Sequence, residues 1–354
     1  MLTNRQERAL EIARQCGADG VLAADPRTVA WLSGISPQVE LGPSSFSYPP
    51  VVLMTKDGHQ VAIVSEDHAT LAQDKGCEVV VYPGYSMAPL DPLGHFESAL
   101  KRTIAGQKIA TEPGFLPFTL SGLLDVIDVS RDLSLARAVK DPEEIERIRA
   151  AVMIADAGQA AVRKFASPGR SEFEVWQDVR EMMELTAGSR LPIAVDLISG
   201  SRTAMIDGSP GSRLISEGDL VLTDLLCRMN GYWSDSCTTF SIGEPSLWAL
   251  GAHRKVQDRL MAAIDAVQPG VLAGDLDARM RLGMNYPHHS GHGIGTSYHE
   301  EPRIVPDSPT VLKPGMVIAL EPALYSELEG VRLEVVVLVT EDGSEVLSNH
   351  GLNL

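Results

Sequence analysis

Four carboxylates stand inside apolar runs of the kind that form β-strands, and they constrain the fold of this chain more than any other feature. They are Asp224, Asp235, Glu321 and Glu334. Burying a charged carboxylate is costly unless it is paired or bound to a cation, and carboxylates that lie close together raise one another's pKa. Divalent cations would remove both costs, so the pattern predicts a metal site. For any single acid, the alternative is a solvent-facing position on an edge strand.

The spacing of the two aspartates predicts a hairpin with one carboxylate on each arm. A two-residue turn at Met229-Asn230 would make Asp224 and Asp235 direct cross-strand neighbours, with Cβ atoms roughly 5 Å apart. A turn at Asn230-Gly231, the stronger local signal, would make them diagonal neighbours at roughly 7–8 Å. Either geometry lets one metal cluster contact both aspartates.

The two glutamates, Glu321 and Glu334, are expected on the opposing arms of a second hairpin. Between the two hairpins, residues 288–292 hold three of the nine histidines, beside glycines that let backbone and ligand approach closely. One of these histidines could supply the nitrogen ligand of an oxygen-rich metal site. A histidine-rich loop considered alone is only modest evidence for a metal.

The composition excludes several other kinds of protein. The chain carries 30 Lys+Arg against 47 Asp+Glu, a net charge of −17, whereas binding to nucleic acid or to an anionic membrane requires a basic surface. No apolar run approaches the roughly 18 residues of a membrane-spanning helix. The four cysteines are too scattered for a disulfide framework, and the charged start of the sequence lacks the apolar core of a signal peptide. We therefore expect a cytoplasmic protein that binds neither nucleic acid nor membrane.

A strong helix start at Asp141-Pro142-Glu143-Glu144 marks a division of the chain, because it combines an N-cap aspartate, a proline at the first helical position and a capping-box glutamate. Upstream, strand-like runs alternate with helical stretches, which is typical of an α/β domain over residues 1–135. Downstream, residues 136–354 are expected to form an α+β domain of antiparallel strands covered by helices. Its expected helices are 142–165, 171–186, 249–267 and 274–283, and its expected strands cluster at 219–227, 231–241, 316–325 and 331–340.

Several motifs together resemble the pita-bread metallopeptidase family, which includes methionine aminopeptidase, aminopeptidase P and prolidase. The resemblance covers the chain from Asp141 to its C-terminus, and the shorter N-terminal domain resembles that of prolidase, aminopeptidase P and creatinase. The matching segments are Lys140-Asp141-Pro142-Glu143-Glu144-Ile145, Gly231-Tyr232-Trp233-Ser234-Asp235, Gly291-His292-Gly293-Ile294-Gly295, His299-Glu300-Glu301-Pro302, Glu321-Pro322-Ala323-Leu324-Tyr325 and Val331-Arg332-Leu333-Glu334.

The resemblance implies two divalent metal ions held by four carboxylates and one imidazole, namely Asp224, Asp235, His292, Glu321 and Glu334. This oxygen-rich set suits Mn²⁺, with Co²⁺ and Zn²⁺ as alternatives. By the same resemblance, a metal-bridging hydroxide is the nucleophile that attacks the scissile carbonyl, and Glu321 shuttles the proton to the leaving nitrogen.

The resemblance also implies residues that contact the substrate. His288 and His299 match positions that line the substrate site and stabilise the tetrahedral intermediate; the alternative for each is a loop histidine hydrogen-bonded for structure. Arg303 matches an arginine that binds the substrate's C-terminal carboxylate in prolidase-like relatives. Arg332 either binds substrate or forms an ion pair that holds Glu334.

The chain departs from the family pattern at several positions, one of which replaces a histidine of the substrate site. Most aminopeptidase P and prolidase relatives carry Pro-His-Gly upstream of the first metal aspartate, where this chain has Ile206-Asp207-Gly208. An ionised acid cannot donate a hydrogen bond as a histidine does, so Asp207 either recognises a cationic part of the substrate or makes an Asp-Gly turn.

The function implied by the resemblance is hydrolysis of Xaa-Pro dipeptides, small peptides with proline at the second position. The short chain and the match of Arg303 favour this activity over that of aminopeptidase P, which acts on longer Xaa-Pro peptides. A metabolite hydrolase or lyase of the same fold is a further alternative because of Asp207. A metal-free binding module is disfavoured because all five ligands are present. The resemblance also implies a homodimer.

Overall fold

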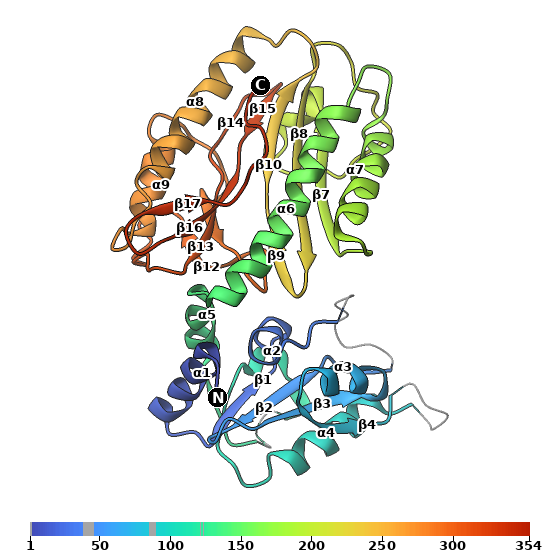
Figure 1. Ribbon diagram of the computed structural model, residues 1–354, viewed down its shortest axis with the longest axis vertical. Helices are drawn as coiled ribbons and strands as arrows, with labels where there is room; N and C mark the ends of the chain where they lie inside the picture. Colours follow the sequence, from blue (N-terminus) through green and yellow to red (C-terminus); the bar gives the residue numbers. More distant parts are fainter. Residues whose placement is uncertain (1, 38–45, 85–89, 121, 123) are drawn as a thin grey trace. The chain divides into compact units, whose positions relative to one another are not determined.

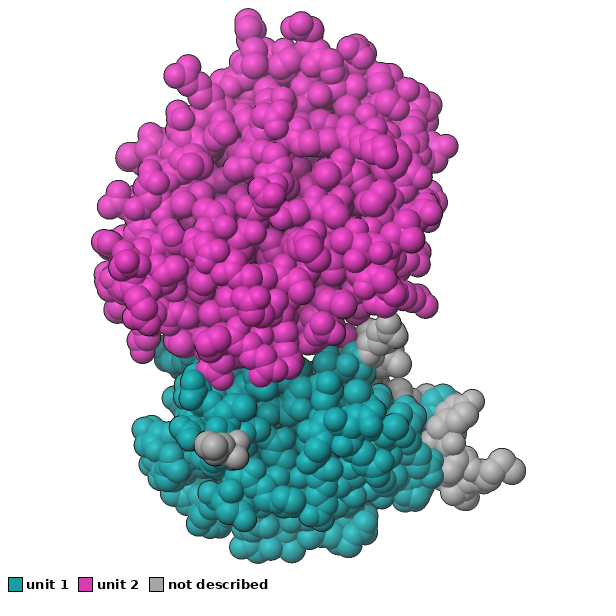
Figure 2. All heavy atoms as spheres, viewed as in Figure 1, with its two compact units in different colours: residues 1–137 teal, residues 138–354 magenta. Residues whose placement is uncertain are grey.

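The computed structural model describes residues 2–37, 46–84, 90–120, 122 and 124–354. The chain forms two compact units, Met1–Arg137 and Ala138–Leu354 (Figure 2). This division lies two residues after the expected boundary at 135/136.

Unit 1 is built on a mixed six-stranded sheet with the strand order β4-β3-β2-β1-β5-β6 (Figure 1). Its strands are β1 (Gly20–Ala23), β2 (Val51–Thr55), β3 (Gln60–Ser65), β4 (Glu78–Tyr82), β5 (Ile109–Thr111) and β6 (Val126–Asp128), and its helices are α1 (Asn4–Cys16), α2 (Pro26–Ser33), α3 (Ala69–Asp74), α4 (Pro92–Thr103) and α5 (Ser130–Ala138). Alternate side chains of the central strands enter two different cores: Val21 of β1 packs in the core of α1 and α2, and Leu22 packs in the core of α4. Because both faces are covered, these strands are apolar throughout. The predicted α/β class is confirmed.

The helices of unit 2 lie close to their expected positions. They are α6 (Pro142–Phe165), α7 (Glu172–Ala187), α8 (Leu247–Ile264) and α9 (Ala273–Arg281). The predicted capping box at the start of α6 is confirmed, since the Asp141 amide donates to Glu144 Oε2 at 2.8 Å. Within the described residues, no helix has both the length and the apolar character needed to cross a membrane.

Two antiparallel sheets form the centre of unit 2. The first has the order β10-β8-β7 with β9 also paired to β8, the second has the order β12-β11-β13-β16-β17, and β14 pairs with β15. The strands are β7 (Ile193–Ser199), β8 (Leu220–Met229), β9 (Tyr232–Ser234), β10 (Cys237–Ser241), β11 (Gly291–Gly293), β12 (Glu300–Ile304), β13 (Val317–Leu320), β14 (Ala323–Tyr325), β15 (Gly330–Arg332), β16 (Val335–Val339) and β17 (Ser344–Val346). Helices α6 and α7 pack against the first sheet, and α8 and α9 share a core with the second.

The hairpin of β8 and β9 decides between the two turns considered above. Met229 pairs with Tyr232, so the turn residues are Asn230 and Gly231, with φ angles of 52° and 84°. Positive φ at both positions is the pattern of a type I′ turn, for which Asn-Gly is favoured. The Asn230-Gly231 turn is therefore confirmed and the Met229-Asn230 turn is wrong.

A single row of paired residues crosses from the first sheet toward the second. Asp224 on β8 pairs with Asp196 on β7 and with Cys237 on β10, and Cys237 forms an isolated bridge to Glu334. In this register Asp235 is a diagonal neighbour of Asp224. The row thus brings carboxylates from both sheets together.

Candidate metal centre

The five predicted ligands line one pocket of about 360 Å³ in unit 2. Asp224 lies within β8 and His292 within β11. Asp235 and Glu321 lie directly beyond the ends of β9 and β13, and Glu334 directly precedes β16. Asp235, His292, Glu321 and Glu334 are between 1% and 6% exposed. The local sequence explains part of this placement. Leu320 before Glu321, and Leu333 and Val335 on either side of Glu334, pack in a core and carry these two acids inward, whereas Asp235 lies between two buried serines.

His292 lies at the centre of the set. Its Nε2 is 3.5 Å from Glu321 Oε1 and 3.7 Å from both Asp235 Oδ2 and Glu334 Oε1. Its Nδ1 is 3.1 Å from the Gly293 carbonyl oxygen, which can only accept a hydrogen bond, so Nδ1 carries a proton. This orientation points Nε2 at the carboxylates, as a metal ligand requires.

The carboxylates of the pocket lack enough partners of their own. Asp224 Oδ1, Asp235 Oδ1 and Glu334 Oε1 are buried and accept no hydrogen bond within the described parts of the chain. Burial and the neighbouring carboxylates raise the pKa of Asp224 to about 7, and they raise the pKa of Asp235 and Glu334 above the usual values. Ligand atoms of Asp235, His292 and Glu334 lie within 4.8 Å of one another. The donor set therefore fits divalent cations, which would supply partners and remove the repulsion.

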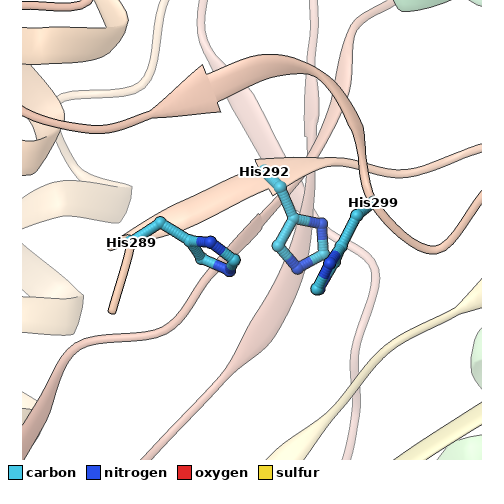
Figure 3. A group of neighbouring side chains, drawn as sticks. All are labelled: His289, His292 and His299. Carbon is cyan, nitrogen blue, oxygen red and sulfur yellow. The ribbon is translucent and has the colours of Figure 1, made fainter. Parts of the chain in front are cut away.

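Glu321 has a partner that the sequence analysis did not single out. His289 Nε2 is 2.7 Å from Glu321 Oε1, and His289 Nδ1 is 3.0 Å from Arg303 Nη2. Because a guanidinium can only donate, Nδ1 accepts and the proton on Nε2 points at Glu321. Burial alone would raise the pKa of Glu321, but the hydrogen bond from His289 and the charge of His292 lower it to about 2. Figure 3 shows the ring of His289 beside those of His292 and His299.

Arg332 forms its ion pair with Asp224. One alternative in the sequence analysis had expected an ion pair with Glu334. Arg332 is 3% exposed, and its Nη2 donates to Asp224 Oδ2 at 2.7 Å. Its Nη1 donates to the Ile206 carbonyl at 2.6 Å and to Tyr325 Oη at 3.3 Å, and its Nε donates to Cys237 Sγ at 3.3 Å. The ion pair in this structure is thus with Asp224, and substrate binding by Arg332 stays a prediction.

The remaining predicted residues surround the same region. His288 donates from Nδ1 to the His289 carbonyl at 2.7 Å and accepts at Nε2 from Tyr325 Oη at 3.0 Å. The ring of His299 lies 4.2 Å from that of His292, centroid to centroid, and Asp207 is an exposed residue of the pocket wall. Arg303 on β12 is exposed. The substrate-binding roles of these four residues stay predictions.

Strand β11 can carry His292 into the centre only because glycines flank it. A Cβ atom on Gly293 would lie 2.0 Å from the Glu301 carbonyl oxygen. We expect Gly293→Ala to cost roughly 3 kcal/mol in the free energy of unfolding and to weaken metal binding, because the β11–β12 pair must separate. Urea unfolding and metal titration measure both effects.

Gly251 on α8 provides the matched control, since a Cβ there meets no described atom within 4 Å. Gly251→Ala should stabilise the protein by about 0.5–1 kcal/mol, as alanine does in a helix interior. Equal stability of Gly293→Ala and the wild type would contradict the close approach of β11 and β12.

Comparison with known proteins identifies the family. Residues 146–341 match the model of Metallopeptidase family M24, and residues 5–149 match that of the Creatinase/Prolidase N-terminal domain. The chain belongs to metallopeptidase family M24. The predicted family and the fold class, an α/β domain followed by a pita-bread domain, are confirmed. Membership in family M24 implies divalent metal ions, in agreement with the donor set.

Relatives within family M24 include enzymes named as dipeptidases. The chain is 37% identical over 239 residues to "Probable dipeptidase PepE" of Mycobacterium tuberculosis, a match that covers 64% of this chain and 63% of that protein. It is 36% identical over 229 residues to the Xaa-Pro dipeptidase of Pyrococcus furiosus, which covers 62% and 65%. These matches thus span slightly less than two thirds of each relative. The prolidase structure from Pyrococcus horikoshii has a TM-score of 0.85 at 26% identity and covers 99% of both chains.

Sequence reasoning missed three residues of this M24 site. His289 stands beside His288 in the same run of histidines, and only the structure shows which of the two contacts Glu321. Tyr325 lies in one of the segments that match the family, and its contacts with His288 and Arg332 appear only in the structure. Asp196 was missed because it interrupts the apolar run of β7, so that this strand was not predicted and only the register with β8 places Asp196 beside Asp224.

Proposed function

We propose that the protein is a metallo-exopeptidase that holds two divalent ions and hydrolyses Xaa-Pro dipeptides. The observation that carries this proposal is the convergence of four carboxylates and His292 in one pocket, where three of the carboxylates each have a buried oxygen atom without a hydrogen-bond partner in the described residues. Two divalent cations balance the four carboxylates in charge. The names of the relatives support the substrate class, since Xaa-Pro dipeptidases and prolidases are among them.

The proposed metal is Mn²⁺, with Co²⁺ and Zn²⁺ as alternatives, because oxygen-rich donor sets suit these ions better than thiolate-loving metals. When bound, such ions acidify a water molecule into a nucleophile and polarise the scissile carbonyl. A homodimer and a cytoplasmic location remain predictions from the sequence.

Side chains of the pocket and its surroundings carry out proton transfer, oxyanion stabilisation and substrate binding. Glu321 accepts a proton and passes it to the prolyl nitrogen as that nitrogen leaves, and the His289 hydrogen bond keeps its carboxylate turned toward His292. His299, whose ring lies against His292, donates a hydrogen bond to the oxyanion, and His288 borders the prolyl ring. Arg303, exposed next to His289, binds the free carboxylate of the dipeptide.

The test compares Leu-Pro and Leu-Pro-Gly as substrates of the Mn²⁺-loaded protein, with a chelator control. We expect chelator-sensitive release of proline from Leu-Pro and much slower cleavage of Leu-Pro-Gly, because Arg303 would contact the carboxylate of a dipeptide. Comparable release of leucine from the tripeptide would assign the protein to the aminopeptidase P activity instead. Cleavage of neither peptide would refute both assignments and direct the search to small non-peptide amides.

A further inference from the structure

Two acids outside the predicted metal-ligand set line the same pocket: Asp196 on β7 and Asp207 in the loop that follows. In the β7–β8 register Asp196 pairs with Asp224 and Ala194 pairs with Leu226. Because alternate side chains of a strand point to the same face, these four residues form one wall of the pocket. The wall therefore presents two carboxylates beside two apolar side chains.

The backbone holds the loop of Asp207 against β7. The Gly208 amide donates to Asp196 Oδ1 at 3.0 Å, and the Leu197 amide donates to the Gly208 carbonyl at 3.2 Å. These two bonds to Gly208 keep the neighbouring Asp207 close to Asp196. Arg332 Nη2 is 3.9 Å from Asp196 Oδ2, but it donates to Asp224 at 2.7 Å, so its strong interaction is with the metal-ligand set.

The pocket carries more negative charge than two divalent ions can balance. Six carboxylates line it, and among the described residues that line it there is neither a lysine nor an arginine. Two divalent ions and Arg332 together compensate five of the six charges. Asp235 is 3% exposed and its Oδ1 has no hydrogen-bond partner in the described chain, so this interior is built to receive cationic groups.

We propose that Asp196 and Asp207 bind the cationic side chain of the residue before proline, so that the protein prefers Lys-Pro and Arg-Pro dipeptides. The proposal rests on the peptidase function proposed above. Leu226 and Ala194 would pack against the aliphatic stem of a lysine or arginine while its charged end reaches the carboxylates.

The α-ammonium group of the substrate is a poorer match for this wall. It is joined through a single carbon to the scissile carbonyl, and so it belongs at the buried centre, where Asp235 and Glu334 are 3% and 2% exposed. Asp207 is exposed, at the outer part of the wall. A long side chain reaches this position, whereas the α-ammonium group does not.

The experiment measures kcat/KM of the Mn²⁺-loaded protein for Lys-Pro, Met-Pro and Nε-acetyl-Lys-Pro, which compare side chains of similar length with and without charge. We expect Lys-Pro to exceed both neutral substrates by about tenfold or more, as for a charge-assisted hydrogen bond in a partly buried site. The ratio of Lys-Pro to Met-Pro should fall toward one in Asp207→Asn and in Asp196→Asn. It should also fall with added salt, because Asp207 is exposed.

Asp258 lies on the exposed surface of α8, so Asp258→Asn is the matched control for removing one negative charge. This variant should keep the wild-type ratio of kcat/KM for Lys-Pro to that for Met-Pro. Asp207→Arg is a second test, because reversing the charge at this position should move the substrate preference toward Glu-Pro.

Cleavage of Met-Pro and Lys-Pro at equal rates by the wild type would overturn the proposal. So would an equal loss for all substrates in Asp207→Asn, which would assign the acids to the α-ammonium group. Cleavage of no dipeptide would instead refute the proposed function, and this proposal with it.

Discussion

Replacing Asp235 by asparagine is expected to abolish peptidase activity and to raise the thermal stability of the metal-free protein. Substituting a residue that only hydrogen-bonds to a metal ligand typically lowers activity roughly 10–100-fold. The loss should be larger here, because Asp235 is itself a proposed metal ligand. Stability should rise because burial, together with the charges of Glu334 and Asp224, raises the pKa of Asp235 well above its usual value. Removing one negative charge from this cluster relieves repulsion that only a cation otherwise relieves.

The two forms of the protein should respond in opposite directions. In the presence of chelator, we expect Asp235→Asn to gain at least ~1 kcal/mol, or roughly 2–4 °C in the melting temperature. With saturating Mn²⁺ the wild type should be the more stable of the two, because only it binds the ions tightly. A variant that melts below the wild type in chelator would show that the acids are not in conflict.

Asp277 offers a matched control, since it is equally buried but well partnered. Asp277 Oδ1 accepts from Arg281 Nε at 2.9 Å and from Ser290 Oγ at 2.5 Å. Asp277→Asn should therefore destabilise the metal-free protein, because it weakens the hydrogen bond and ion pair with the half-buried Arg281.

The same cluster sets a pH dependence for the metal-free protein. The pKa of Asp224 is raised from 3.8 to about 7 in the folded state, chiefly by burial. Between these values the folded state binds a proton that the unfolded state has released, so the free energy of unfolding should decrease as the pH rises from about 4 to about 7. Saturating Mn²⁺ should reduce this loss, and denaturant titrations at several pH values measure it.

Replacing Arg332 by methionine is expected to cost about 3–5 kcal/mol in the free energy of unfolding and to abolish activity. Methionine keeps much of the buried volume but leaves Asp224 and the Ile206 carbonyl without their donor, and breaking a buried ion pair on one side has this magnitude. Arg332→Lys should recover part of the stability, because it restores the charge without the planar fork.

This substitution also separates the two roles considered for Arg332. If the guanidinium binds substrate, Arg332→Met should retain its stability and lose mainly in KM; if it holds Asp224, stability and metal affinity should fall together. Arg149 is the control, because its ion pair with Glu345 is on the surface. Arg149→Met should change stability by no more than about 1 kcal/mol.

Local signals in the sequence predicted most of unit 2. The Asp141 capping box marked the start of α6, and the Asn230-Gly231 dipeptide marked the turn that sets the register of Asp224 and Asp235. Such features depend on a few neighbouring residues, and so they can be read along the chain. Strand β7 was missed because Asp196 interrupts its apolar pattern.

Contacts between distant segments could not be predicted from spacing. Arg332 stands two positions before Glu334, and this short spacing suggested an ion pair between the two residues. Closeness in sequence does not decide which partner a side chain contacts. The Asp224 carboxylate reaches Arg332 from another sheet. His288 and His289 are likewise neighbours in sequence, and only the direction of each side chain decides that His289 contacts Glu321.

The row of paired residues that joins the two sheets has a consequence for the order of events during folding. Asp224 and Glu334 are 110 positions apart in the sequence, and the bridge from Cys237 to Glu334 forms only when a loop of that order has closed. Closing so long a loop is slow and is opposed by chain entropy. A metal ion cannot gather these ligands from an unfolded chain, so it should enter a scaffold that has already assembled. Refolding rates should then be independent of Mn²⁺ concentration, while unfolding rates fall as the ion is added.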